Sequence, residues 1–217
     1  KRRPGLDIAI IEPSDSHAYQ PGWTMVGGGV FDVKTTLRSE ASVMPKGVKW
    51  IKAAAKSFEP DNNLVTLEDG QTVTYDALVV APGIRLAWEK IAGVEEALGK
   101  NGVTSNYRYD LASYTWQLVQ GLKKGRAIFG QPPMPIKCAG APQKAMYLSC
   151  DHWRRAGVLG DIEVEFRNAG GVLFGVKDYV PALQSYVDKY GINTHFNQNL
   201  IAVDGPGQKA TFKTEEG

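Results

Sequence analysis

The apolar residues of this chain form short β-type runs in its first third and alternating strand and helix patterns in its second half. The first run, residues 6–11 (Leu-Asp-Ile-Ala-Ile-Ile), is nearly continuous and ends at Glu12, which is typical of a buried parallel strand. Residues 14–47 predict mainly loops. Within them, residues 27–29 (Gly-Gly-Gly) follow no strand and lack G-x-G-x-x-G spacing, so they predict a flexible turn. Further strands are predicted at residues 48–54, 64–67 and 75–83, with a hairpin turn at residues 68–71.

The second half predicts a parallel sheet. Residues 84–124 form a connector that contains an amphipathic helix at residues 111–122. After the connector, strands are predicted at residues 127–129, 161–167, 193–203 and 208–214, and helices at residues 143–155 and 177–190. This β-α-β-α-β-β order indicates a parallel sheet with helices on its faces.

Glu12 stands where the second strand of a Rossmann unit places a carboxylate that accepts hydrogen bonds from ribose hydroxyls. Such a unit needs a first strand and a glycine-rich loop about 20 residues upstream. Glu12 is therefore either an ordinary acid at a strand end or part of a domain that the sequence enters after its first βα unit. Because the chain also stops just after a strand, we expect both ends to lie inside domains.

Composition narrows the class of protein. With 217 residues, 43% of them hydrophobic and 22% charged, the chain is expected to be soluble and globular, as one large domain or two small ones. Its net charge of +2 predicts no nucleic-acid partner. No apolar run in this sequence approaches the roughly 20 residues that cross a bilayer, and its first residues do not have a signal-peptide pattern, although attachment to a membrane surface stays open.

The segment with the strongest chemical signal is residues 137–146, Lys-Cys-Ala-Gly-Ala-Pro-Gln-Lys-Ala-Met. It lies between a predicted strand and a predicted helix, where a dinucleotide-binding unit would carry phosphate-binding glycines. Pro142 suits the first turn of the helix, so Cys138 precedes a helix N-terminus, whose partial positive charge favours a thiolate. Lys137 and Lys144 add positive charge if their side chains point that way. The residues alone leave two alternatives open: a reactive thiolate, or a small buried residue in a tight loop.

The other candidate side chains predict structural roles. Cys150 shares a helical face with Met146 and Trp153 and is predicted to be a core residue that forms no disulfide with Cys138. The three histidines have no metal-ligand spacing, and no metal site is predicted. His17 is expected at the surface or in a hydrogen bond, and the remaining two are expected on the exposed part of a helix (His152) and along a strand (His195).

Residues 75–83, Y-D-A-L-V-V-A-P-G, resemble the second fingerprint of flavoproteins with two dinucleotide-binding domains. Three further stretches narrow this resemblance, at residues 18–23 (A-Y-Q-P-G-W), 41–45 (A-S-V-M-P) and 137–148. Together they resemble the sulfide:quinone oxidoreductases, in the branch that contains the mitochondrial enzyme and its proteobacterial relatives. The resemblance covers essentially all 217 residues, and the string K-C-A-G-A-P-Q-K is specific to that branch.

This resemblance implies an α/β fold with two Rossmann-like dinucleotide-binding domains, both incomplete, and a small antiparallel β insert. Residues 1–100 would form part of the FAD-binding domain with the insert, and residues 101–217 the second domain with the redox cysteine. The resemblance implies FAD as the cofactor, Cys138 as one of two redox cysteines, and five cofactor-binding residues, Glu12, Gln20, Ala55, Ala81 and Gly83. The second redox cysteine and the glycine-rich FAD loop would lie outside the sequence.

The implied activity is the oxidation of hydrogen sulfide to persulfide or sulfane sulfur, with a quinone as electron acceptor and sulfite or a thiol as sulfur acceptor. The implied location is peripheral, on the bacterial cytoplasmic membrane or the mitochondrial inner membrane, with the membrane contact in regions outside the sequence.

The sequence leaves three alternatives. A nicotinamide-dependent flavoprotein, such as a type II NADH dehydrogenase, would need a G-x-G-x-x-G loop after the strand at 127–129. Residues 130–135 (Gly-Gln-Pro-Pro-Met-Pro) disfavour it, because prolines offer no amide donors to a pyrophosphate. The second is a non-catalytic fragment that keeps only the fold, and the third is a flavocytochrome c sulfide dehydrogenase, which would need a haem subunit.

Overall fold

The computed structural model describes residues 5–215 and separates into two compact units. Within the described residues, unit 1 comprises residues 5–18 and 37–83, and unit 2 comprises residues 19–36 and 84–215. The predicted division into two domains, residues 1–100 and 101–217, stays a prediction.

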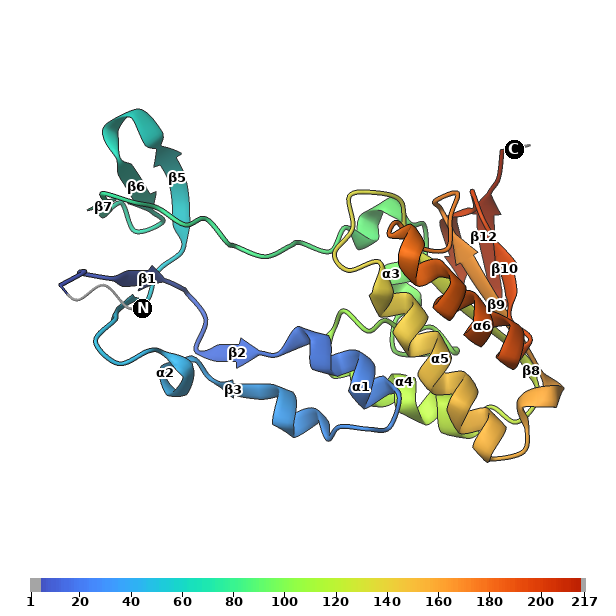
Figure 1. Ribbon diagram of the computed structural model, residues 1–217. Helices are drawn as coiled ribbons and strands as arrows, with labels where there is room; N and C mark the ends of the chain where they lie inside the picture. The colour runs from blue at the N-terminus through green and yellow to red at the C-terminus, as the bar shows by residue number, and fades with distance from the viewer. Residues whose placement is uncertain (1–4, 216–217) are drawn as a thin grey trace. The chain divides into compact units, whose positions relative to one another are not determined.

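Unit 1 is built from three small sheets (Figure 1). Its elements are β1 (Ala9–Ile11), β2 (Ser16–Ala18), β3 (Leu37–Ser39), α2 (Glu40–Val43), β4 (Lys49–Ile51), β5 (Ala55–Glu59), β6 (Leu64–Leu67) and β7 (Thr72–Thr74). β1 pairs in parallel with β4, β2 pairs antiparallel with β3, and β5, β6 and β7 form an antiparallel sheet. The last sheet is the predicted antiparallel insert, and its β6–β7 connection is the predicted hairpin turn.

The first predicted strand is parallel, but it is shorter than residues 6–11 and is not buried. β1 begins at Ala9, and the preceding side chains of Leu6 and Ile8 are 63% and 46% exposed. A parallel strand is buried when elements cover both of its faces, and β1 lies in a sheet of two strands. The strand predicted at 48–54 is likewise divided, with β4 ending at Ile51 and β5 starting at Ala55.

The strand predicted at residues 75–83 is wrong in the described structure. These residues have no regular secondary structure, and the side chains of Val79 and Val80 are 88% and 56% exposed. A β-strand is held by hydrogen bonds to a neighbouring strand. No strand within residues 5–215 pairs with this segment, so its apolar pattern alone does not produce one.

Unit 2 contains the parallel sheet (Figure 1). Its elements are α1 (Trp23–Gly27), α3 (Val94–Ala97), α4 (Tyr109–Gly121), β8 (Gly125–Gln131), α5 (Gly140–Arg155), β9 (Ile162–Asn168), α6 (Val180–Tyr190), β10 (Asn193–His195), β11 (Asn199–Asp204) and β12 (Lys209–Lys213). The strands lie in the order β10-β9-β8, all parallel, as the alternating pattern predicts. The end of the chain differs from the prediction, because the expected strand 193–203 is split into two and β11 pairs antiparallel with β12.

One face of the parallel sheet packs against the helices. Phe166 and Val164 of β9 are buried with Met146 and Trp153 of α5 and with Val187 of α6. The Trp153 indole donates a 2.8 Å hydrogen bond to the carbonyl of Val119 in α4, which satisfies its buried N–H group. Burial of these large side chains at about 1.5–3 kcal/mol each is the main term that holds the layers together.

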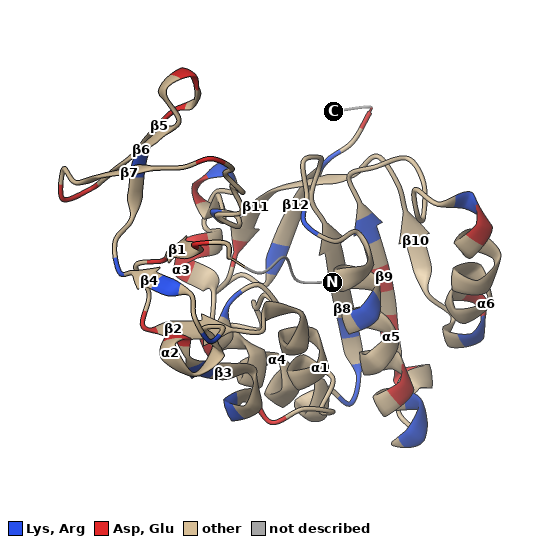
Figure 2. Ribbon diagram, turned by 60° about the vertical axis from the view of Figure 1, so that its left-hand side comes forward, with Lys and Arg blue, Asp and Glu red and all other residues tan. Residues whose placement is uncertain are grey.

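β9 also contains charged residues, which alternate with its apolar ones and are coloured along the strand in Figure 2. Glu165 is only 3% exposed, and its carboxylate lies 3.1 Å from the Arg126 guanidinium and 2.5 Å from that of Arg167. The Arg167 guanidinium also stacks over the Phe212 ring of β12, 4.9 Å from its centroid. The buried carboxylate is therefore matched by two cations, as a buried charge requires.

The run of three glycines at the end of α1 is required by close packing against two other helices. A Cβ atom at Gly29 would lie 2.3 Å from the Trp116 indole of α4, and the φ angle of Gly29 is +73°. A Cβ atom at Gly28 would lie 2.7 Å from Leu148 of α5. The predicted turn is present, and close packing of α1 against two helices requires its glycines.

Candidate functional site around Cys138

Cys138 lies in the loop between β8 and α5, at the carboxyl end of a parallel strand. Residues 132–139 have no regular structure, since the prolines at 132, 133 and 135 provide no N–H groups for a strand ladder. The Cys138 backbone has a φ angle of +64°, a left-handed conformation that costs a residue other than glycine about 1–2 kcal/mol. Its thiol is exposed and free. The alternative of a small buried residue is therefore excluded.

The helix after Cys138 starts earlier than predicted. α5 begins at Gly140 rather than Gln143, and Ala139 is its N-cap residue with no side-chain cap. Pro142 is the third helical residue, where its missing N–H is still one that the helix does not use. The backbone N–H of Ala141 donates a 3.0 Å hydrogen bond to the Cys138 carbonyl. Cys138 thus directly precedes the N-cap, at the end of the helix whose dipole favours an anion.

The neighbour Lys137 is held by two residues that are distant in sequence. Its ammonium donates a hydrogen bond to the side-chain carbonyl of Gln20 and lies 6.0 Å from the centre of the Tyr107 ring. The Tyr107 hydroxyl donates a hydrogen bond to the Lys137 carbonyl. Burial raises the pKa of Tyr107, and the charge of Cys138 raises it further. Lys137 is therefore engaged with Gln20 and Tyr107, while Lys144 is exposed.

Sequence reasoning missed two residues at this end of the sheet. Tyr107 has no motif around it, and its contact with Lys137 spans 30 residues. Gln143 is 2% exposed, and its side-chain amide donates a 2.7 Å hydrogen bond to the Leu173 carbonyl, which fixes the loop after β9 against α5. The Tyr147 hydroxyl donates to Gln143 at 3.2 Å, and burial raises the pKa of Tyr147 to about 12. The available signal was the spacing of Gln143, three and seven residues before Met146 and Cys150, which places it on the same helical face as these two predicted core residues.

The second cysteine is a core residue, as predicted. Cys150 is fully buried on α5 among Met146 and Trp153. Burial raises the pKa of the Cys150 thiol to about 12, so it stays protonated at neutral pH. Both cysteines are free thiols.

Four of the five predicted cofactor-binding residues lie in unit 1. Glu12 directly follows β1, and its carboxylate Oε1 accepts a 2.7 Å hydrogen bond from the Ser14 N–H. Its Oε2 accepts none from the described residues, so it has lone pairs for a ribose hydroxyl. Ala55 is exposed at the start of β5, and Ala81 and Gly83 are exposed in the irregular segment 75–83. A carboxylate with free lone pairs and three small exposed residues are the groups that the resemblance predicts against the ribose and the flavin of FAD.

The fifth, Gln20, belongs to unit 2. It lies in a short 3-10 helix (Gln20–Gly22) before α1 and accepts the hydrogen bond from Lys137 described above. The structure thus joins Gln20 to the residue next to Cys138, a contact between positions 117 residues apart.

The histidines have structural surroundings. His17 Nδ1 lies 3.0 Å from Oε2 of the buried Glu40, which agrees with the predicted hydrogen bond. His152 is half-buried rather than exposed, since its ring packs edge-on against Trp116 at 4.8 Å. His195 lies in β10 opposite Arg167. Within residues 5–215, no cluster of three or more His, Cys, Asp and Glu side chains could hold a metal ion.

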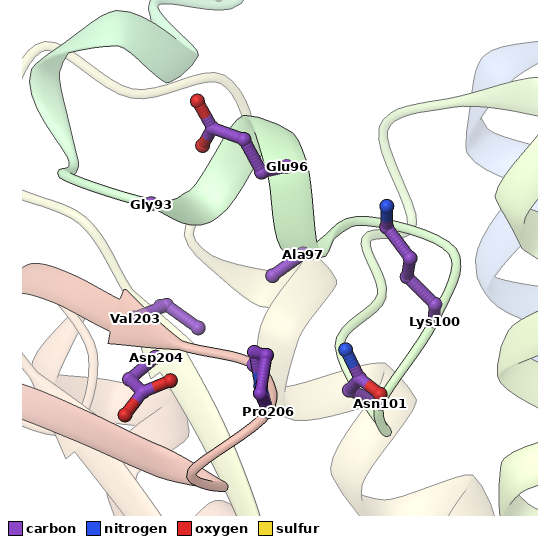
Figure 3. A pocket seen from close by; sticks show the side chains of 9 residues that line it. Gly93, Glu96, Ala97, Lys100, Asn101, Val203, Asp204 and Pro206 are labelled. Carbon is purple, nitrogen blue, oxygen red and sulfur yellow. The ribbon is translucent and has the colours of Figure 1, made fainter.

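Unit 2 also has an open hollow of about 360 Å³ between α3 and the β11–β12 turn (Figure 3). Its lining includes the charged residues Glu96, Lys100 and Asp204. None of the predicted site residues lines it.

No family model matches the sequence. The chain is 42% identical over 212 residues to the mitochondrial sulfide:quinone oxidoreductase of Dictyostelium discoideum, which covers 97% of the chain and 47% of that protein. It is 41% identical over 214 residues to the mitochondrial sulfide:quinone oxidoreductase of the mouse, and this match covers 98% of the chain and 48% of the mouse protein. The chain is similar to sulfide:quinone oxidoreductases over nearly its whole length. The predicted resemblance is confirmed.

Solved structures confirm the predicted α/β fold. The crystal structure of the sulfide:quinone oxidoreductase from Aquifex aeolicus matches with a TM-score of 0.78 at 22% identity, over 99% of this chain and 50% of that one. The chain therefore spans about half the length of the sulfide:quinone oxidoreductases that it matches. No helix within residues 5–215 has the length and apolar character needed to cross a membrane.

Proposed function

We propose that this chain forms part of a flavoprotein that oxidises sulfide and reduces a quinone, with Cys138 as one of its redox cysteines. The observation that carries the proposal is the exposed thiol of Cys138, held next to the N-cap of α5 in a chain 42% identical to a sulfide:quinone oxidoreductase. A helix N-terminus favours the thiolate that sulfur chemistry requires.

In the proposed reaction, Cys138 and a second cysteine outside this chain are joined through a bridging sulfur atom. Hydrosulfide attacks the Cys138 sulfur and forms a persulfide there. The bond between Cys138 and the bridging sulfur breaks, and the bridging sulfur leaves on the second cysteine as a persulfide anion that keeps the electron pair of the broken bond. Bound FAD would supply the two-electron acceptor that passes this pair to a quinone. Sulfite or a thiol then takes the outer sulfur from Cys138, which regenerates its thiolate.

The residues of this chain that would hold FAD are Glu12, Gln20, Ala55, Ala81 and Gly83. Glu12 supports this role with a carboxylate oxygen that is left without a hydrogen-bond donor in the described chain. We propose that residues 1–100 provide the FAD contacts and residues 101–217 the redox cysteine, with Gln20 as the FAD contact adjoining Lys137.

We further propose a peripheral location on a membrane, where a quinone is available. The names of the two relatives favour the mitochondrion and hence its inner membrane, rather than a bacterial cytoplasmic membrane.

The deciding experiment is sulfide-dependent reduction of a short-chain ubiquinone by the protein that contains this chain, with and without Cys138→Ser. We expect the substitution to lower kcat by about 10³-fold or more, because serine cannot hold sulfane sulfur. Cys150→Ala is the matched control and should keep activity within a few-fold. Undiminished activity of Cys138→Ser would refute the proposal.

The same assay tests the nicotinamide alternative. Pro132 and Pro133 directly follow Gln131, the last residue of β8, where a pyrophosphate-binding unit needs glycines and free amides. NADH should therefore reduce the quinone far more slowly than sulfide does. Equal rates with the two donors would favour the nicotinamide-dependent flavoprotein instead.

A further inference from the structure

The loop that carries Cys138 is held from outside by Tyr107. This residue lies just before α4, and its half-buried ring brings the hydroxyl to the carbonyl of Lys137, the residue before the cysteine. This hydrogen bond joins residues 30 positions apart in the sequence. It attaches the loop to the segment that leads into α4, whose Val119 belongs to the hydrophobic core.

Hydrogen bonds hold the chain on both sides of Cys138. On the first side, Tyr107 binds the Lys137 carbonyl and Gln20 binds the Lys137 ammonium. On the second side, the Cys138 carbonyl accepts the 3.0 Å hydrogen bond from the Ala141 N–H. Cys138 itself has a φ angle of +64°, a conformation that persists in a residue other than glycine only when its surroundings hold it.

Tyr107 is suited to remain a hydrogen-bond donor while Cys138 ionises. Its pKa is raised first by burial and then by the charge of Cys138, so that its hydroxyl keeps its proton when the thiolate forms. If the Tyr107 hydroxyl lost its proton when Cys138 ionised, it could no longer donate to the Lys137 carbonyl, and the loop would be released when the thiolate is needed.

We propose that Tyr107 is a positioning residue for Cys138, which holds the Lys137–Cys138 peptide so that the exposed thiolate attacks from a fixed position. This inference rests on the proposed function of Cys138. Tyr107 acts through the backbone of Lys137, and no contact with substrate is assigned to it.

The test compares Tyr107→Phe with Tyr114→Phe. Tyr107→Phe removes the hydroxyl and keeps the ring beside Lys137. Tyr114→Phe removes a hydroxyl of the same unit that accepts a 3.2 Å hydrogen bond from the Gly102 N–H, in a turn that does not include Cys138. Hydrogen exchange of the backbone amides at 136–141 reports directly on the loop, and it requires neither cofactor nor substrate.

We expect Tyr107→Phe to speed exchange at 136–141 about fivefold, the effect of losing one hydrogen bond, and Tyr114→Phe to leave it within twofold. In the sulfide assay, Tyr107→Phe should lower kcat about fivefold or more with KM for sulfide unchanged. The rates are compared at a temperature below the onset of unfolding of both proteins, so that a loss of folded protein does not account for the fall. Unchanged exchange at 136–141 would overturn the inference, and so would faster exchange with an unchanged kcat. If the unsubstituted protein has no sulfide activity, the proposed function fails, and the exchange result alone still decides whether Tyr107 holds the loop.

Discussion

The two cysteines of the chain occupy opposite environments, and their reactivity should differ accordingly. Cys138 is exposed next to a helix N-cap, whereas burial raises the pKa of Cys150 to about 12. At pH 8 the thiolate fraction of Cys150 is then about one in 10⁴. Iodoacetamide should therefore alkylate one thiol of the native chain and two of the chain unfolded in guanidinium, as counted by mass spectrometry.

Cys138→Ser is the decisive variant for this assignment. It should abolish alkylation of the native chain and leave one reactive thiol after unfolding. Modification of native Cys138→Ser at the rate of the unsubstituted chain would show that Cys150 is accessible, against its position in the core.

His152 should make the stability of unit 2 depend on pH. Burial lowers the pKa of His152 from its usual 6.5, and the charges of Lys123 and Arg155 lower it further. The unfolded chain then takes up this proton at a higher pH than the folded chain does. The contribution of neutral His152 to the free energy of unfolding is fully present above pH 6.5. It is lost as the pH falls through the pKa that His152 has in the folded chain.

His152→Phe keeps a ring against Trp116 and cannot titrate. The fall in Tm between pH 7.5 and 5.5 should be smaller in this variant than in the unsubstituted protein. Asp151, whose pKa is held below its usual 3.8 by Arg154 and Arg155, titrates outside this window. Equal falls in Tm would mean that His152 is not responsible.

At the scale of elements, the junction of α3 with β11 depends on a glycine. Gly93 precedes α3 with a φ angle of +72°, and a Cβ atom there would lie 2.2 Å from the Val203 carbonyl oxygen (Figure 3). Gly93→Ala should destabilise the protein by the cost of the left-handed conformation, about 1–2 kcal/mol, and by the added clash with backbone.

Gly102→Ala separates these two costs. Gly102 has a similar φ angle of +79° and nothing within 4 Å of an added Cβ. Urea unfolding should therefore show Gly93→Ala to be less stable than Gly102→Ala by about 1 kcal/mol or more. Equal stabilities would contradict the close approach of α3 and β11.

The elements of unit 2 could be predicted because their specification is local. β8, α5, β9 and α6 each carry an apolar periodicity that their own residues encode. Residues 75–83 carry an equally strong β-type pattern and form no strand, because a strand also depends on neighbours that no local pattern reveals.

At the site, local features could be predicted and contacts between distant residues could not. The position of Cys138 before a helix N-terminus follows from a string of adjacent residues. Lys137 is hydrogen-bonded to Tyr107, 30 residues away, and to Gln20, 117 residues away. Neither residue type indicates in the sequence which partner it will bond. The buried Glu165 was missed for a similar reason, since both arginines that neutralise it become neighbours only when β8 and β9 pair.

At the scale of the whole molecule, the proposed roles lie mostly in different units, because unit 1 holds every proposed FAD contact except Gln20 and unit 2 holds the redox cysteine. Unit 1 carries Glu12 at the end of β1, and unit 2 carries Cys138 before α5. If flavin binding and sulfur chemistry are separate contributions of these units, a substitution in one unit should remove its own contribution and spare the other.

Two variants of the protein that contains this chain test that separation. Glu12→Ala should lower the flavin bound per polypeptide about tenfold or more, measured by absorbance near 450 nm, because it removes an acceptor for the ribose hydroxyls, and each charged hydrogen bond contributes roughly 1.5–3 kcal/mol. Its Cys138 should still react with iodoacetamide at the unsubstituted rate. Cys138→Ser should keep its flavin and lose sulfide-dependent quinone reduction.

Glu59→Ala is the matched control for Glu12 and should keep both flavin and activity. It removes an exposed carboxylate of unit 1 that, among the described residues, is hydrogen-bonded only to Asn62. Full flavin content in Glu12→Ala would remove Glu12 from the proposed FAD site, and loss of flavin in Cys138→Ser would show that the two roles are not separable.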